Sequence, residues 1–243
     1  MRRRSSFSEQ RERRRRLLNA IGLAFILLLA YELVSGTLVA PVAVASRSMA
    51  PGLEPGDLVL VSSLAYGGRL EPFGVRLPGA REPERGDIAL VEAPWSERPS
   101  ALTLAADALL RLVTFQRVGL TGRSAGVADR ALKRIIALPG DRLYAKDGVF
   151  FVKVPGAGHF LTEFEVSGRV YELGATPAPE GWSDELPLSD SYPELALGPD
   201  EYFLAGDDRL ASADSRVWGP VGRDRLLGRV SFRYWPFARF GKP

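Results

Sequence analysis

The feature that most constrains this chain is a long apolar stretch that follows directly on an arginine-rich N-terminus. Residues 1–16 contain eight arginines and two glutamates, whereas Leu17 to Tyr31 carry no charge. A helix of about 20 apolar residues spans a bilayer. Residues 17–36 therefore predict a transmembrane helix, and the arginines before it predict that residues 1–16 are a cytoplasmic tail. Residues 37–243 are then expected on the extracytoplasmic side.

Two other interpretations of the N-terminus start from the same residues. Ala43 and Ala45 form an A-x-A pattern of the kind that ends a cleavable signal peptide. The apolar run is longer than the roughly 7–15 residues of a signal-peptide core, which favours an uncleaved anchor. An arginine-rich arm that binds anionic lipid is compatible with that anchor.

The excess of positive charge lies in the tail. The whole chain has a formal net charge of +3, and residues 1–16 contribute +6, so the remaining residues sum to −3. A body with this charge lacks the basic surface that nucleic-acid binding requires. We therefore expect membrane lipid, and no nucleic acid, among the partners.

The chain contains no cysteine and a single histidine, His159. Without cysteine there are no disulfides, thiol nucleophiles or thiolate metal sites. A Ser-His-Asp mechanism would have to use His159, which lies in a glycine-rich segment that predicts an exposed turn. The sequence indicates no metal and no cofactor, and a serine nucleophile would need a different base.

Short β-branched and leucine-rich runs bounded by turn residues predict a mainly β body. A helical spacing of apolar side chains predicts an inserted helix at 100–116. Insertions are expected at about 67–84, where we predict a surface loop, at 95–128, and at 174–199, where we predict an irregular connection. Strands are expected at 37–45, an edge strand because it contains Pro41, and at 58–61, 88–91, 131–138, 202–206 and 228–235, with hairpin material at 143–153 and 159–173.

Ser46 and Ser48 lie between the apolar stretch and the strand predicted at 58–61, followed by a Pro-Gly and a Gly-Asp turn. Most turn serines only cap local backbone groups. A neutral serine becomes a nucleophile when a base lies within hydrogen-bonding distance. Arginine does not deprotonate in proteins, so the candidate bases are carboxylates and lysine.

Lys133 is the lysine whose surroundings suit that role. The chain has only four lysines among its 32 basic residues, and this one lies beside Leu132, Ile135 and Ile136. Burial among apolar groups would lower the pKa of its amine toward neutrality. The alternative is a lysine at a strand edge with its ammonium in water. Spacing alone does not bring Ser48 and Lys133 together, because 85 positions separate them.

Four motifs nevertheless occur in an informative order. They are Ser46-Arg47-Ser48-Met49-Ala50-Pro51-Gly52-Leu53, Arg85-Gly86-Asp87-Ile88, Lys133-Arg134-Ile135-Ile136-Ala137-Leu138-Pro139-Gly140-Asp141, and Gly206-Asp207-Asp208-Arg209 through Ser212-Ala213-Asp214-Ser215-Arg216. Together they resemble the conserved boxes of bacterial type I signal peptidases, and the likeness extends from the apolar stretch to Trp235-Pro236. The resemblance implies an antiparallel, coiled, barrel-like β-sheet body behind an N-terminal transmembrane helix.

The resemblance also implies roles for individual residues. Ser48 matches the nucleophile and Lys133 the general base of a Ser-Lys dyad, which is a variant of triad chemistry. Ser46 matches the hydroxyl that completes the oxyanion hole with the Ser48 backbone N–H. Ser212 matches a serine that orients the lysine amine. Structural support is implied for Asp207, Arg209, Asp214 and Arg216, of which Asp214 and Arg216 match an ion pair beneath the site.

In that family the substrate is added as an extended strand beside segments that match Val42–Ser46 and Arg130–Lys133. Small apolar pockets would accept alanine-sized side chains at the −1 and −3 positions of the substrate. The A-x-A pattern of the chain itself then forms part of a pocket wall. The residues implied as pocket lining are Val44, Ala45, Met49, Leu53, Ala131 and Leu132.

The implied function is that of a membrane-bound serine endopeptidase of the signal peptidase I type, which removes signal peptides from secretory preproteins near the translocation machinery. The chain departs from the family pattern at Ala131-Leu132, at Gly52, and at Asp208, Leu210 and Ala211. The alternatives are a specialised signal peptidase, an inactive membrane-anchored homologue that binds peptides, and a self-cleaving Ser-Lys domain.

Overall fold

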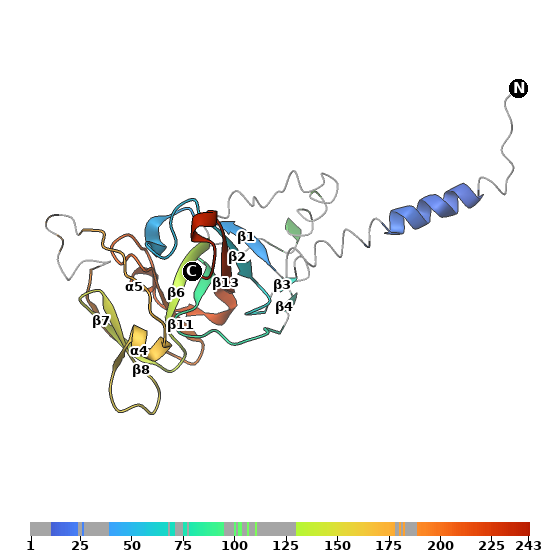
Figure 1. Ribbon diagram of the computed structural model, residues 1–243. Coiled ribbons are helices and arrows are strands. Elements are labelled where there is room, and N and C mark those ends of the chain that lie inside the picture. Colours follow the sequence, from blue (N-terminus) through green and yellow to red (C-terminus); the bar gives the residue numbers. More distant parts are fainter. Residues whose placement is uncertain are drawn as a thin grey trace, which may run out of the picture.

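The structure of the chain is a computed structural model, and its described part is mainly β (Figure 1). Two antiparallel sheets form the body, and the helical segments of the body are short. The expectation of a mainly β, antiparallel fold is therefore confirmed. The described residues are 11–23, 26, 39–67, 69–70, 75–76, 78–94, 100, 102–103, 106, 110, 130–177, 180, 182 and 189–243.

The larger sheet has seven strands in the order β1-β2-β13-β5-β6-β11-β12, and all neighbours are antiparallel. Strand β13 uses its first half to pair with β5 and its second half to pair with β2, with register shifts along both ladders. Register shifts of this kind bend a strand, and the sheet is open between β1 and β12 in the part that the structure describes. The strands are β1 (Ala40–Ala43), β2 (Leu58–Ser62), β5 (Ile88–Glu92), β6 (Arg130–Ala137), β11 (Glu201–Ala205), β12 (Val221–Gly222) and β13 (Leu226–Trp235).

The smaller sheet has four strands in the order β10-β7-β8-β9. Strands β7 and β8 form the hairpin predicted at 143–153, and a two-residue turn joins them at Asp147 and Gly148. Both turn residues have positive φ, 53° and 75°, which an Asp-Gly pair tolerates. The strands are β7 (Arg142–Lys146), β8 (Val149–Lys153), β9 (Leu161–Thr162) and β10 (Tyr192–Ala196).

Three loop and hairpin predictions were wrong in part. Residues 159–173 contain the short helix α4 (Glu163–Ser167), which begins at a capping box made by Thr162 and Glu165. The connection at 174–199 contains strand β10, which pairs with β7. The loop at 67–84 contains a small ladder between β3 (Arg69–Leu70) and β4 (Val75–Arg76). The remaining short elements are η1 (Arg47–Met49), α5 (Ser215–Trp218), η2 (Arg223–Arg225) and η3 (Phe237–Arg239).

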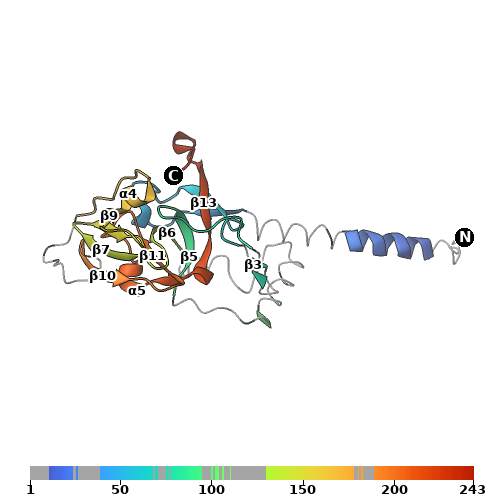
Figure 2. The same cartoon turned by 90° about the horizontal axis from the view of Figure 1, so that it is seen from below.

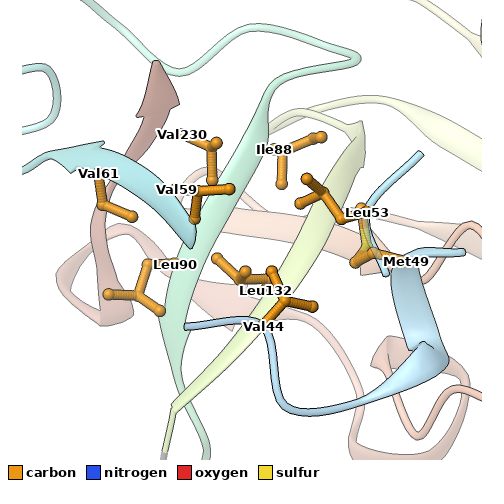
Figure 3. Close-up of a cluster of buried hydrophobic side chains, with 9 residues drawn as sticks. All are labelled: Val44, Met49, Leu53, Val59, Val61, Ile88, Leu90, Leu132 and Val230. Carbon is orange, nitrogen blue, oxygen red and sulfur yellow. The ribbon is translucent and has the colours of Figure 1, made fainter. Parts of the chain in front are cut away.

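Strand β5 is buried on both faces and separates two hydrophobic clusters. Ile88 and Leu90 belong to one cluster, and Ala89 and Val91 belong to the other. Figure 3 shows the first cluster, in which side chains from the four strands β2, β5, β6 and β13 and from the loop around η1 point toward one another. A third cluster joins the two sheets. Each fully buried valine, leucine or isoleucine contributes about 1.5–3 kcal/mol, so these clusters hold the sheet in one geometry.

The two predicted helices fall largely outside the described residues. Residues 11–23 are helical, and the rest of the anchor predicted at 17–36 is described only at residue 26. No helix in the described part of the chain combines the length and the apolar character needed to cross a membrane. The helix predicted at 100–116 is described at residues 100, 102, 103, 106 and 110, of which residue 100 is not helical and the other four are.

Candidate active site

Ser48 lies in the short 3-10 helix η1, which the loop from Val44 to Asp57 holds in place. Backbone hydrogen bonds join Val44 N–H to Asp57 C=O at 2.8 Å and Gly56 N–H to Val44 C=O at 2.9 Å. Met49 and Leu53 anchor the loop in the hydrophobic cluster of Figure 3. Ser48 is therefore buried in a fixed backbone, while Ser46 is exposed, and their hydroxyl oxygens are 3.1 Å apart.

Lys133 lies in the middle of the sheet, in β6, opposite Ala89 of β5. Only 3% of its surface is exposed. Burial lowers the pKa of Lys133 to about 8; attraction to Asp214 and Asp207 opposes this change and repulsion from Arg216 adds to it. Its Nζ atom donates a hydrogen bond to Ser212 Oγ at 2.9 Å. The amine thus has the pKa and the fixed orientation that a general base needs.

Ser212 connects the amine to a buried carboxylate. Its hydroxyl donates to Asp214 Oδ2 at 2.8 Å, and Asp214 also accepts from the Gly206 N–H at 3.0 Å. Arg216 pairs with Asp214 at 2.9 Å. Burial alone would raise the pKa of Asp214, but the Arg216 guanidinium, the Gly206 N–H and the Lys133 amine hold it below its ordinary value. Asp214 is thus a fixed negative charge behind Ser212.

Gly206 lies between the backbone of Ser48 and the side chain of Ser212. A Cβ atom at this position would lie 2.4 Å from Ser48 O and 2.2 Å from Ser212 Oγ. Both serines therefore approach the same backbone, which only glycine permits. The N–H of Asp208 also donates to Ser48 C=O at 3.1 Å, and η1 packs against β6. The tertiary fold thus places Ser48 beside the strand that carries Lys133.

No direct hydrogen bond joins Ser48 and Lys133 among the residues that the structure describes. The Ser48 hydroxyl pairs with Ser46, and the Lys133 amine pairs with Ser212. Catalytic hydrogen bonds are often long in a free enzyme and shorten when substrate binds. The absence of this bond in the free protein is therefore compatible with a catalytic role for the two groups.

The residues expected to support the site form two further buried ion pairs. Asp207 binds the guanidinium of Arg134 through two hydrogen bonds of 2.7 and 2.6 Å. Arg209 pairs with Glu163 and also donates to the carbonyls of Gly148 and Gly206. The sequence motifs assign no role to Arg134 or Glu163. The position of Arg134 next to Lys133 suggests that Arg134 belongs to the site, whereas no sequence feature indicates a role for Glu163.

The six residues implied as substrate lining separate into three locations. Val44, Met49, Leu53 and Leu132 are buried together in one hydrophobic cluster (Figure 3). Ala45 is exposed next to Ser46. Ala131 packs against the cluster on the opposite side of the sheet. The structure therefore brings four of these residues together and separates the other two from them.

The single histidine takes no part in this site. His159 is exposed in the turn that follows β8, as expected from its glycine-rich surroundings. In the described part of the chain, no group of three or more histidine or carboxylate side chains is arranged to hold a metal ion.

Comparisons with known proteins point to one family. The family model "Signal peptidase, peptidase S26" matches residues 15–235. A probable signal peptidase I-2 from Synechocystis sp. is 29% identical over 81% of this chain and 63% of its own length. A thylakoidal processing peptidase 1 from Arabidopsis thaliana is 27% identical over 84% of this chain and 44% of its own length. A signal peptidase IB from Staphylococcus aureus is 23% identical over 91% of this chain and 89% of its own length.

The match thus spans less than two thirds of the first two relatives and most of the third. The four motifs around Ser48, Asp87, Lys133 and Ser212 all lie within residues 15–235, the region that the family model covers. Because that region includes nearly all of the chain, the chain belongs to the signal peptidase family, peptidase S26.

Proposed function

We propose that the chain is a serine endopeptidase that removes N-terminal signal peptides from translocated preproteins. The observation that carries this proposal is the buried amine of Lys133, which Ser212 orients at 2.9 Å on a strand packed against the helix that bears Ser48. A lysine with a pKa of about 8 is neutral in a useful fraction of molecules near neutral pH. The family membership supports the same chemistry.

In the proposed reaction, neutral Lys133 takes the proton of the Ser48 hydroxyl, and the oxygen attacks the scissile carbonyl. The negative charge on that carbonyl oxygen is stabilised by the Ser48 N–H and the Ser46 hydroxyl. The protonated lysine then gives its proton to the leaving amine, and an acyl-enzyme on Ser48 remains. Lys133 next takes a proton from water, and the resulting hydroxide equivalent attacks the ester. The acyl C–O bond breaks, the protonated lysine returns its proton to the Ser48 oxygen, and the peptide carboxylate leaves.

An extended substrate fits the unpaired backbone near the site. Strand β6 pairs with β11 only through its second half, from Arg134 to Ala137, so its beginning has no partner on that side among the described strands. Strand β1 pairs only with β2 and is the edge of the sheet. A peptide added as a strand between these two segments would place its carbonyl beside Ser48. Small side chains in the peptide would then face Val44, Met49 and Leu132.

We further propose that residues 17–36 anchor the protein in the cell membrane, with the arginine-rich tail in the cytoplasm. The support is the absence of charge from Leu17 to Tyr31 and the eight arginines before it. Ser48 follows the predicted end of the anchor by only 12 residues, so the site would lie close to the outer membrane surface. A signal peptide held in the membrane presents its cleavage site there. Translocated preproteins, membrane lipid and the translocation machinery are the proposed partners.

The test is cleavage of a detergent-solubilised precursor with an A-x-A site by purified protein. We expect cleavage after the −1 alanine by the wild type and loss of cleavage in both Ser48→Ala and Lys133→Ala. The control is Lys146→Ala, because Lys146 is an exposed lysine on the smaller sheet and its loss should leave the rate unchanged. EDTA should also leave the rate unchanged.

Retention of full activity by either dyad variant would overturn the assignment of the dyad. A folded wild type that binds precursors without cleaving them would instead support an inactive peptide-binding homologue. Cleavage restricted to a narrow set of precursors would support a specialised peptidase.

A further inference from the structure

Residues 169–177, called the strap here, run from α4 toward the active site and contact elements that are far apart in the sequence. Arg169 Nη2 donates to Asp87 Oδ1 at 2.6 Å, at the start of β5. The Gly174 N–H donates to Asp207 C=O at 2.9 Å. The Thr176 hydroxyl donates to Asp208 Oδ2 at 2.6 Å. The strap is therefore tied both to the sheet and to the loop that follows β11.

The strap approaches that loop more closely than a side chain allows. A Cβ atom on Gly174 would lie 2.5 Å from Asp208 Cβ and 2.7 Å from Asp208 Cα. One of the two atoms belongs to the backbone, so a rotamer change in Asp208 would not make room. Gly174 is thus required by close backbone packing, independently of any conformational freedom of glycine.

Asp208 connects the strap to the nucleophile. Its N–H donates to Ser48 C=O at 3.1 Å, while its carboxylate receives the Thr176 hydroxyl. Only 2% of Asp208 is exposed, and its second carboxylate oxygen, Oδ1, has no hydrogen-bond partner in the described structure. The hydroxyl of Thr176 is therefore the side-chain contact that orients this buried carboxylate.

The strap also contacts the strand of the proposed base. The guanidinium carbon of Arg134 lies 3.7 Å from the centre of the Tyr171 ring, an arrangement in which cation and ring attract each other. Arg134 is the neighbour of Lys133 in β6 and binds Asp207. The strap thus contacts Asp208, which is bound to Ser48, and Arg134, which is next to Lys133.

We infer that Gly174 and Thr176 are positioning residues for the cleavage reaction: by holding Asp208, they hold the backbone of Ser48 at a fixed distance from Lys133. This inference rests on the proposed peptidase function. A displacement of about 1 Å between reacting groups can lower a rate by as much as about 100-fold. The strap does not touch the reacting atoms in the described structure, so its effect is expected in kcat and not in substrate binding.

The test compares Thr176→Val, which keeps the shape and removes the hydroxyl, with Thr176→Ser, which keeps the hydroxyl. We expect Thr176→Val to lower kcat by about tenfold, which corresponds to a small misplacement of the nucleophile, with KM unchanged. Thr176→Ser should restore most of the wild-type kcat. Gly174→Ala should lower kcat at least as much as Thr176→Val. Glu172→Gln, an exposed position of the same strap, is the matched control and should resemble the wild type.

Amide hydrogen exchange provides a readout that does not depend on activity. The Asp208 N–H is protected by its hydrogen bond to Ser48 C=O. This amide should therefore exchange faster in Thr176→Val than in the wild type, and at the wild-type rate in Glu172→Gln. If the wild type cleaves no precursor, the proposed function fails, and exchange at Asp208 alone decides the role of the strap. The inference would be overturned if Thr176→Val kept both the wild-type kcat and the wild-type exchange rate at the Asp208 amide. Equal loss of kcat in Thr176→Ser would also overturn it, because the hydroxyl would then not matter.

Discussion

At the scale of single residues, burial makes the protonated form of Lys133 unfavourable. Its amine is almost fully buried, and burial lowers its pKa from 10.5 to about 8. A shift of one unit corresponds to about 1.4 kcal/mol, so the protonated amine costs the folded state about 3 kcal/mol. The folded pKa lies below the unfolded one, so the unfolded chain binds more protons between these values. The contribution of Lys133 to stability therefore rises with pH from about 8 to 10.5.

The same pKa predicts how cleavage depends on pH. In the proposed mechanism the neutral amine is the active form, so kcat/KM of the wild type should rise about tenfold per pH unit well below pH 8 and level off above it. Measurement of kcat/KM with an A-x-A precursor between pH 5.5 and about 9.5, the range that brackets this pKa, tests the prediction. A profile that is flat across pH 8, or that falls with rising pH, would contradict Lys133 as the base.

At the scale of elements, the end of the chain clasps the loop that carries Ser48. Arg239, in η3, pairs with Asp57, whose side chain is only 1% exposed. Arg233, in β13, donates to Gly52 C=O at 2.7 Å and approaches Asp57 at 3.4 Å. Figure 2 shows η3 beyond the end of β13, after the strand has crossed the sheet. The last residues of the chain thus close the loop from Ser46 to Asp57 from the outside.

Loss of this clasp should destabilise the protein. Arg239→Ala leaves the buried carboxylate of Asp57 with the Glu54 N–H and the longer contact to Arg233. A buried hydrogen bond to a charged group contributes about 1.5–3 kcal/mol, and we expect a loss of that size in the free energy of unfolding. Urea denaturation measures it, with Lys242→Ala as the control because Lys242 is exposed nearby in sequence. Equal urea midpoints for Arg239→Ala and Lys242→Ala would contradict the role of the clasp.

At the scale of the whole molecule, the proposed orientation in the membrane can be tested by labelling, because the natural chain has no cysteine. A single cysteine at Ser8→Cys reports on the tail, and one at Val170→Cys reports on the body, where Val170 is 99% exposed. A membrane-impermeant maleimide that can reach the outer face of an intact cell membrane should label Val170→Cys at once. It should label Ser8→Cys only after the cell membrane is opened. The reverse pattern would overturn the proposed topology.

Much of the fold at this scale could be predicted from local patterns, and the failures have identifiable causes. The strands predicted at 58–61, 88–91 and 131–138 correspond to β2, β5 and β6, because each is a β-branched or leucine-rich run after a turn. Helix α4 was missed although Thr162 and Glu165 form a capping box, because the helix has only five residues and a short apolar pattern there also suits a strand. Strand β10 depends on pairing with β7, which no local pattern reveals.

The sequence by itself determined the chemistry that is open to this protein: it has no cysteine, its one histidine lies in a turn, and Ser48 and Lys133 stand in ordered motifs. Residue types and short spacings are local properties, so they can be read without coordinates. Only the tertiary structure decided which polar and charged side chains meet, since the partners in Arg134–Asp207, Arg209–Glu163 and Thr176–Asp208 lie far apart in the sequence. Such contacts depend on how the strands cross and pack, and that packing also buries Lys133 and brings it beside Ser212.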